Sequence, residues 1–317
     1  MTKTQITDLV DPQLWANYVA ENSVTNLSLY QSGIIVPIPA LAVPKGPSVN
    51  VPYFAPVTVS NSGQGQLLDD ANPLVVQKQT ANSMVSPVHN RGDAWGFNEL
   101  AGSYAGADPV GYTLGKISEK WNEIIQLQAF KTLEGAVASA SMSGSVLGNT
   151  NANAATFSAS YMLDAQQLLG DAQSKLKALI VHSAVRTAMR KANLTDFELD
   201  SNNQQIEFYQ GMRLIVNDAA PVDIANAVYT SYYVGEGVLG FADGHDLASI
   251  ETDRDILAGD TNITSRRSYV LHPVGMTWGQ ALTGTTPSNT DIATGANWDR
   301  RFDKKNIPLI AVRCKVA

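Results

Sequence analysis

The segment from residue 49 to 95 limits the possible folds more than any other part of the chain. Apolar side chains occupy every second position from 49 to 59, which is strand periodicity, and Pro52 and Pro56 fall on the opposite face. Turn-forming residues at 60–66 and 69–73 predict a tip, and residues 74–84 predict a weaker returning strand. A hairpin with so few apolar residues cannot form its own core, so its apolar face is expected to contact another subunit.

The first forty-odd residues predict an arm rather than a domain. Asp11 and Pro12 form a helix-start signal ahead of the aromatic Trp15 and Tyr18. Four prolines between positions 37 and 47 then exclude a helix and favour an extended backbone. Because an extended segment cannot bury its own apolar residues, this arm is expected to lie against other parts of an assembly.

The clearest helix start in the sequence is Asp108, a capping residue that precedes Pro109. Apolar residues then recur at steps of three and four positions, and charged residues fill the other side. The apolar positions are Leu114, Ile117, Trp121, Ile124, Ile125, Leu133 and Val137. The pattern predicts one helix of about seven turns, followed by a mobile loop over the small-residue tract 136–159.

The second half of the chain alternates helix and strand patterns, which predicts a mixed α/β layer. Ser160 is expected to cap a helix that runs to about residue 177. An apolar run at 178–181 predicts a strand buried on both faces, and another helix is expected at 184–192. Further strands are predicted at 211–216, 228–234, 254–270 and 307–316.

Composition limits the possible functions. With 44% hydrophobic and 16% charged residues among 317, the chain can bury a substantial core. A net charge of −7 argues against sequence-specific nucleic-acid recognition, although an acidic protein can still enclose DNA. The single cysteine, Cys314, excludes an internal disulfide and a Cys-based zinc site. No targeting segment or membrane-spanning stretch is evident, so assembly in the cytoplasm is expected.

Three patterns that often accompany catalysis have structural explanations that fit better. The glycines at 235, 237 and 240 match a dinucleotide-binding spacing, but turn-forming residues follow them where a helix should begin. His245 lies between two aspartates in an expected solvated turn, and His182 is expected to be a hydrogen-bonded core residue. Ser174 and Lys177 lack the partner motifs of a hydrolase. No enzyme, metal site or cofactor is therefore predicted.

Basic and aromatic side chains are the candidate contact residues. Arg186 and Arg190 share one side of a predicted helix, and 266–267 and 300–301 are short basic pairs. These arginines are either solvated or form inter-subunit ion pairs with carboxylates such as those at 251, 253 and 255. Aromatic residues in the arm and hairpin base are typical of contact anchors. The predicted inter-subunit contacts are Trp15, Tyr18, Tyr53, Lys78, Arg91, Trp95, Arg186, Arg190, Arg266 and Arg267.

The order of these parts, with several local sequences, resembles the major capsid proteins of tailed bacteriophages, whose fold is shared by herpesvirus capsid floors and encapsulin shells. The local similarity lies in VHNRGDAW at 88–95, LAGSYAGADP at 100–109, LIVHS at 179–183, YQGMRLIVND at 209–218 and RSYVLHPVG at 267–275. The resemblance implies an α+β fold with an arm (1–46), an extended hairpin loop (47–98), a peripheral domain with a spine helix (99–145 and 240–300) and a mixed α/β axial domain (146–239 and 301–317).

The resemblance also implies a function. The chain would self-assemble without catalysis into an icosahedral shell around packaged double-stranded DNA, as part of a virion. Expected partners are copies of itself in hexamers and pentamers, portal and scaffold proteins, an optional decoration protein and DNA in non-specific contact. A bacterial nanocompartment shell of the encapsulin type is the alternative within the fold, and a nucleotide-dependent enzyme is a remoter one. Some relatives cross-link a hairpin lysine, but no partner for Lys78 is evident, so cross-linking is not expected.

Overall fold

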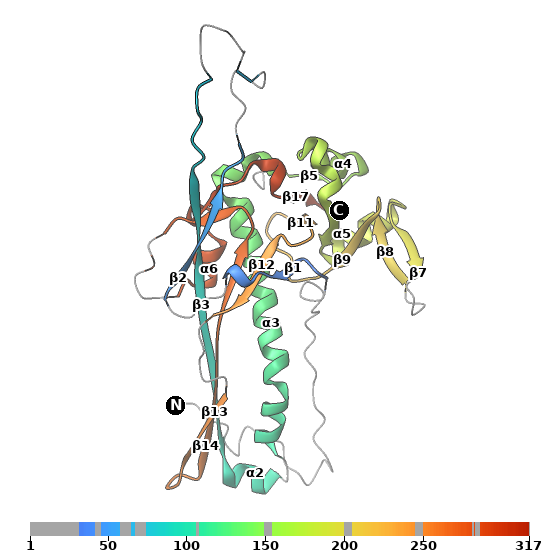
Figure 1. The fold of residues 1–317 in the computed structure, drawn as a ribbon. Helices are drawn as coiled ribbons and strands as arrows, with labels where there is room; N and C mark the ends of the chain where they lie inside the picture. Colours follow the sequence, from blue (N-terminus) through green and yellow to red (C-terminus); the bar gives the residue numbers. More distant parts are fainter. Residues whose placement is uncertain are drawn as a thin grey trace.

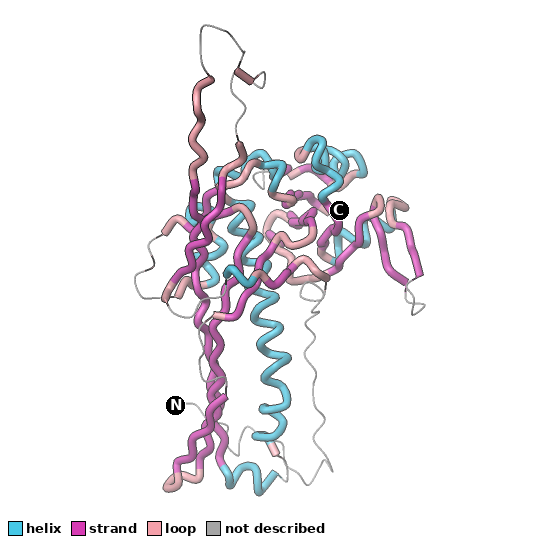
Figure 2. Tube along the Cα trace, viewed as in Figure 1, coloured by secondary structure: helices cyan, strands magenta, loops and turns pink. Residues whose placement is uncertain are grey.

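The computed structural model describes residues 32–41, 46–57, 65–66, 74–105, 108–148, 154–199, 205–244, 250–280, 282 and 286–316. These residues form an elongated molecule with a globular body (Figure 1). A long helix and long strands run from the body toward one end, and a narrow projection leaves it at the opposite end (Figure 2). The mixture of helices and sheets confirms the predicted α+β class.

One strand, β3 (Ala81–Asn98), runs through much of the length of the molecule. Its 18 residues span roughly 60 Å at about 3.3 Å per residue. Its first part pairs antiparallel with β2 (Ser48–Phe54), from Phe54 opposite Ala81 to Ser48 opposite Pro87. Its second part pairs antiparallel with β14 (Asp260–Pro273). The returning strand therefore begins later than the sequence predicted, because residues 74–80 have no strand partner, and it continues into the body.

A six-stranded sheet forms around β3 and β14. The strand order is β1-β12-β14-β3-β2, and β13 pairs with the far end of β14. The remaining members are β1 (Ile35–Pro37), β12 (Leu239–Asp243) and β13 (Ile250–Asp255). The predicted strand at 254–270 is thus two strands, because the Asp255 carboxylate accepts hydrogen bonds from the backbone of Leu257 and Ala258 and closes a turn. A short helix, α2 (Glu99–Ala105), follows β3.

Helix α3 (Pro109–Ala138) lies alongside this sheet and spans roughly 45 Å at 1.5 Å per residue. The predicted start is confirmed, since the Asp108 carboxylate accepts a hydrogen bond from the backbone N–H of Gly111 at 2.9 Å. Trp121 is buried against the sheet and donates its indole N–H to the Ser265 hydroxyl at 2.8 Å. The apolar cluster between helix and sheet comprises Phe97, Ile117, Trp121, Ile125, Ile263 and Tyr269.

The C-terminal half of α3 enters the main core of the body. Phe130 and Leu133 are fully buried there. Gly135 permits a close approach of α6 (Asn289–Ala293), because a Cβ at this position would lie 1.9 Å from the backbone oxygen of Ile292. The short elements η7 (Gly295–Asn297), β15 (Met276–Trp278) and β16 (Trp298–Arg300) complete this region, with β15 and β16 paired antiparallel.

A nine-stranded sheet forms the other part of the body. Its order is β4-β17-β11-β6-β9-β8-β7, with β10 beside β11 and β5 beside β17. The predicted central strands are confirmed as β6 (Leu176–Val181), β9 (Met212–Val216), β11 (Val228–Gly235) and β17 (Leu309–Lys315). The others are β4 (Val146–Leu147), β5 (Ala155–Thr156), β7 (Asp196–Leu199), β8 (Gln205–Tyr209) and β10 (Val222–Asp223). Helices α4 (Ala159–Gln167) and α5 (Ser183–Lys191) lie beside it (Figure 1).

Two predictions for this region were wrong in detail. The tract 136–159 is not a single loop, because α3 continues to Ala138 and is followed by η4 (Ala140–Ser145) and then β4 and β5. The next helix is capped by Ser158 rather than Ser160, with its hydroxyl accepting a hydrogen bond from the Tyr161 N–H at 3.2 Å. That helix ends at Gln167, since Gly170 adopts a positive φ of +64° and begins η6 (Gly170–Lys175).

Candidate subunit interface

Exposed apolar side chains gather at the projecting ends of the described structure. Val76 is 94% exposed on the segment that precedes β3, and Leu257 is 100% exposed in the turn between β13 and β14. Other exposed apolar side chains at these ends are Phe54, Val57, Leu74, Val75, Leu100, Phe197, Leu199, Ile250 and Ile256. Large exposed apolar surfaces of this kind are typical of contacts with a partner. The ends are therefore the candidate interface.

The base of the hairpin packs within its own subunit. Val49 and Val51 lie against a buried cluster that includes Val88 and Val270. The ring of Tyr53 meets Phe302 edge-on, with 5.1 Å between centroids. The expectation that the whole apolar face needs another subunit was thus wrong for its base, because β3 continues into the sheet and brings the base onto the body. Lys78, beyond the paired region, is exposed.

Two predicted contact residues on β3 take part in internal packing. The Arg91 guanidinium donates to the backbone oxygen of Pro287 at 2.5 Å and to the Thr286 hydroxyl at 3.3 Å, and so holds the segment before α6 against the strand. Trp95 is half-buried and packs against the cluster under α3. Trp15 lies outside the described residues, as does Tyr18.

Arg186 and Arg190, on α5, share one buried partner. Their guanidinium groups both bind Glu207 of β8, each through an Nε at 2.5 Å from a carboxylate oxygen. The Glu207 side chain is 7% exposed, whereas those of the two arginines are 35% and 45% exposed. Arg190 also lies over the ring of Phe197 at 5.4 Å. These arginines fasten the β7–β8 pair to α5, a role that the sequence did not predict.

Arg266 and Arg267 also find carboxylates within the subunit. Arg266 pairs with Glu251 across the β13–β14 ladder at 2.8 Å, and Arg267 pairs with Asp243 at 3.0 Å. The expected partnership between an arginine pair and the carboxylate at 251 therefore exists, but within the subunit. Both Arg266 and Glu251 keep half of their side-chain surface exposed, so this pair remains available at the face of the sheet.

His182 is a helix cap rather than a core histidine. Its Nδ1 accepts a hydrogen bond from the Ala184 backbone at 3.1 Å, and its Nε2 lies 3.5 Å from the Asp218 carboxylate. The same carboxylate accepts the Ser183 backbone N–H, and its hydrogen bonds to Ser183 hold the pKa of Asp218 below its usual range. His182, Ser183 and Asp218 are thus adjacent here. The hydrogen bonds that His182 and Asp218 accept come from backbone N–H groups at the start of α5, so these side chains cap the helix.

Two other histidines are buried in the six-stranded sheet. Burial, reinforced by the Arg91 charge, lowers the pKa of His89 to about 3. Burial lowers the pKa of His272 to about 4. The His89 ring lies 5.6 Å from that of Tyr269, whose hydroxyl bonds to Gln128 of α3. Both histidines are therefore neutral at physiological pH and form part of the core.

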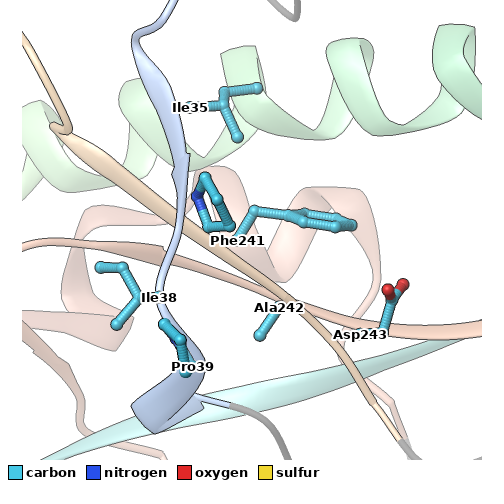
Figure 3. Close-up of a pocket in the computed structure, with 7 residues that line it drawn as sticks. Ile35, Ile38, Pro39, Phe241, Ala242 and Asp243 are labelled. Carbon is cyan, nitrogen blue, oxygen red and sulfur yellow. The ribbon is translucent and has the colours of Figure 1, made fainter.

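One hollow beside β1 has a mostly apolar lining. It measures roughly 550 Å³ and is lined by Ile35, Pro37, Ile38, Pro39, Phe241, Ala242 and Asp243 (Figure 3). Asp243 is the only titratable residue among them, and it faces Arg267. The hollow offers an apolar contact surface between β1 and β12.

The glycine-rich motif is a strand connection, as the sequence predicted. Gly235 ends β11, Gly237 adopts a φ of +67°, and Leu239 begins β12, so no helix follows the glycines. Among the described residues, no group of three or more His, Cys, Asp or Glu side chains is placed to hold a metal ion. His245 lies outside the described part of the chain. No helix in that part is long and apolar enough to cross a membrane.

The sequence did not predict two of the sites where apolar side chains are exposed. Phe197 and Leu199 lie on the edge strand β7, where all four residues are exposed. Ile256 and Leu257 occupy a turn that the sequence placed inside one strand. For Ile256 and Leu257 the available signal was the preceding Asp255 and the following Gly259, residue types that favour a turn rather than a buried strand.

Comparisons with known proteins agree on one family. Residues 112–307 match the family described as Gp13-like, major capsid protein 13-like. The whole chain is 33% identical over 321 residues to the major capsid protein of Bacillus phage SPP1, covering 98% of both.

Solved capsid structures share the fold at low sequence identity. The Cyanophage Pam1 capsid has a TM-score of 0.60 at 12% identity, covering 96% of each chain. The Mycobacterium phage Che8 structure has a TM-score of 0.57 at 12% identity, covering 83% of this chain and 93% of that one. The SrpI encapsulin of Synechococcus elongatus has a TM-score of 0.54 at 9% identity, covering 100% and 98%. The chain therefore belongs to the Gp13-like family of major capsid proteins, within the fold of tailed-phage capsids.

Proposed function

We propose that this chain builds, from copies of itself, the icosahedral shell of a tailed bacteriophage around double-stranded DNA. The observation that carries the proposal is the 33% identity to a phage major capsid protein along 98% of the chain. A similarity that runs end to end includes the hairpin, the spine helix and both sheets, and so extends to the parts that would join subunits.

The geometry supports assembly by head-to-tail contacts. The exposed apolar residues lie at different ends of the molecule, near Val76 at one end and Leu257 at the other. Surfaces at different ends of an elongated molecule suit heterologous contacts, in which one end of a subunit meets the other end of its neighbour, and such contacts close into rings when the rotation permits. Hexamers and pentamers are such rings. The predicted contacts at Tyr53, Lys78 and the arm remain part of this proposal.

Several further features of the proposal follow from the family. Portal and scaffold proteins, and in some shells a decoration protein, would contact the assembled subunits. DNA would be held without sequence specificity, because a chain of net charge −7 attracts phosphates only locally. Assembly would take place in the host cytoplasm and place the protein in the virion capsid. The division into arm, hairpin loop, peripheral domain and axial domain belongs to the same proposal, as does the absence of catalysis.

An encapsulin-type nanocompartment is the second candidate. It is supported by the structural similarity to the SrpI encapsulin over the whole chain, at a TM-score of 0.54. That similarity has only 9% identity and reflects the fold, whereas the phage relative shares a third of its residues. The contents of the native particles discriminate between the two candidates, since one encloses DNA and the other encloses enzymes.

Sedimentation velocity and electron microscopy of the purified chain test the proposal. We expect capsomer-sized rings, closed shells or both at micromolar concentration. A folded chain that sediments only as a compact monomer, with or without a co-expressed scaffold, would contradict it.

A further inference from the structure

The segment around β16 and η8 (Lys304–Asn306) carries an excess of positive charge. The cations in and beside it are Lys175, Arg300, Arg301, Lys304 and Lys305. The carboxylates among them are Asp171, Asp299 and Asp303. Five cations and three carboxylates leave two positive charges unbalanced, in a chain whose total charge is −7. The charge of this patch is therefore opposite in sign to the net charge of the whole chain.

Each carboxylate in the patch is already engaged. Asp171 pairs with Lys305 at 2.7 Å, and Asp299 lies 3.9 Å from Arg301. Asp303 caps η8 by accepting the backbone N–H of Lys305 at 2.9 Å. Within the described part of the chain, the side chains of Arg300 and Lys304 are left with no carboxylate partner.

Both residues lie against the turn η4. The backbone N–H of Arg300 donates to the Ser141 hydroxyl at 2.8 Å, which fixes β16 against η4. The amine of Lys304 lies 3.5 Å from the position that a Cβ on Gly144 would occupy, so its side chain crosses the same turn. Both side chains are partly buried, and a partly buried cation is stabilised by an opposite charge. Desolvation, with the Arg300 charge, lowers the pKa of Lys304.

The patch adjoins the hairpin base. Phe302, between the two cations in sequence, holds the ring of Tyr53, so the patch lies beside the point where β2 leaves the body. A neighbouring subunit that binds along the hairpin base would therefore also contact the patch.

A complementary surface lies on β13, at the opposite end of the molecule (Figure 1). Alternate residues of this strand, Glu251, Asp253 and Asp255, share one face of the sheet and are all exposed. Arg266 neutralises Glu251, and Arg254 pairs with Glu99. Asp253 has no partner among the described residues, and Asp255 meets only backbone N–H groups of its turn. Two negative charges are thus left on β13, which equals the positive excess of the patch.

We propose that Arg300 and Lys304 form an inter-subunit contact that receives the carboxylates of Asp253 and Asp255 from a second copy of this chain. The contact joins the hairpin base of one subunit to the β13 face of its neighbour, which is the head-to-tail arrangement that rings require. The inference rests on the proposed shell function and adds the residues that set the register between neighbours.

A charge-swap experiment tests the contact. Lys304→Asp and Asp253→Lys, each alone, place like charges opposite each other, and each is expected to reduce the yield of closed shells roughly tenfold. The two substitutions in one chain restore opposite charges and are expected to restore most of the yield. Lys177→Asp, at an exposed lysine outside the patch, is the matched control and should assemble normally. Melting temperatures of all variants, measured before assembly, identify any that fail to fold.

Zero-length carbodiimide cross-linking gives a second measurement that does not depend on variants. Particles are assembled from equal amounts of ¹⁴N and ¹⁵N subunits, so that a mixed-isotope peptide pair identifies a contact between copies. A Lys304 cross-link to the peptide that contains Asp253 and Asp255, with mixed isotopes, is expected.

The outcomes separate this inference from the shell function itself. Wild-type particles that close, combined with a Lys304→Asp variant that also closes normally, would overturn the contact and leave the shell function intact. Loss of shells without rescue by the double swap, together with no mixed-isotope cross-link, would overturn it as well. In that case, a rise in the melting temperature with inorganic phosphate or short DNA would show that the patch binds phosphates instead.

Discussion

The body of this protein and its projecting ends use apolar side chains in opposite ways. In the body, Leu133 and Tyr232 are fully buried, as are most residues in the C-terminal half of α3. At the ends, Val76 and Leu257 are almost fully exposed. The contrast indicates that the body supplies the stability of the subunit and that the ends supply association energy. Variants in the two regions should therefore affect unfolding and assembly separately.

The largest stability effect is expected at Trp121, where α3 meets the sheet. Trp121→Ala should lower the free energy of unfolding by about 3–5 kcal/mol, because it leaves a cavity and removes the hydrogen bond to Ser265. Denaturant unfolding of unassembled subunits measures the change. Leu257→Ala, at a fully exposed position, is the control and should change the stability by less than about 0.5 kcal/mol. Equal losses of unfolding free energy in the two variants would contradict the distinction between the body and the ends.

The buried histidines should make the body sensitive to acid. In the unfolded chain a histidine binds a proton near pH 6.5, whereas in the folded chain His89 does so only near pH 3 and His272 near pH 4. Between these values the unfolded state binds more protons, so stability falls as the pH falls below 6.5. We expect a loss of about 2 kcal/mol between pH 6.5 and 5.5 for the two histidines together.

The matched variant for this test is His89→Gln, which removes one titrating group. Its unfolding free energy should depend on pH with about half the slope of the parent in the same window. Measurements stay above pH 5, because carboxylates such as Asp171 and Asp218, whose pKa values are lowered, contribute their own losses in stronger acid. A slope that does not change would mean that His89 does not titrate on unfolding in this range.

A smaller effect is expected at Glu207, the shared partner of two arginines. Glu207→Gln should cost about 1–2 kcal/mol, because it removes a buried negative charge while the partly exposed arginines regain some hydration. Thermal unfolding of the subunit measures the loss. Because β8 belongs to the nine-stranded sheet and α5 lies beside that sheet, an effect that appears only in shell yield would place this cluster at an interface instead.

The smallest effect is expected for the exposed pair between Arg254 and Glu99, near the β13–β14 end. Both side chains are more than half exposed, so Arg254→Gln should change the unfolding free energy by about 0.2–1 kcal/mol at most. Increasing the salt concentration should reduce the difference further. A loss above 2 kcal/mol would show that this end stabilises the fold, contrary to the distinction drawn above.

The sequence predicted the elements that follow local rules. The Asp108-Pro109 start of α3, the buried strand at 178–181 and the turn at Gly237 depend on capping, apolar runs and glycine conformation, all of which act over a few residues. The hairpin was predicted from alternation and proline placement. Its returning strand was placed too early, because the partner of β3 beyond Pro87 is β14, which lies far away in the sequence.

The partners of the candidate contact residues could not be predicted in the same way. Arg186 and Arg190 meet Glu207, and Arg91 meets the backbone of Pro287, about 200 residues away. Such pairs depend on which strands neighbour each other, and that order is a property of the whole fold rather than of any local pattern. The aromatic contact at Tyr53 depends in the same way on Phe302, near the other end of the chain.

Replacing residues 56–79 by a short Gly/Ser linker tests the central claim most directly, since it removes the projecting segment while leaving β2 and β3 paired. The variant is compared with the parent by calorimetry of the subunit and by electron microscopy after assembly. The account predicts cooperative unfolding within about 1 kcal/mol of the parent, because the described residues in this stretch, 56–57, 65–66 and 74–79, are exposed or only partly buried, together with the absence of closed shells. A variant that closes normal shells, or a subunit that no longer unfolds cooperatively, would contradict it.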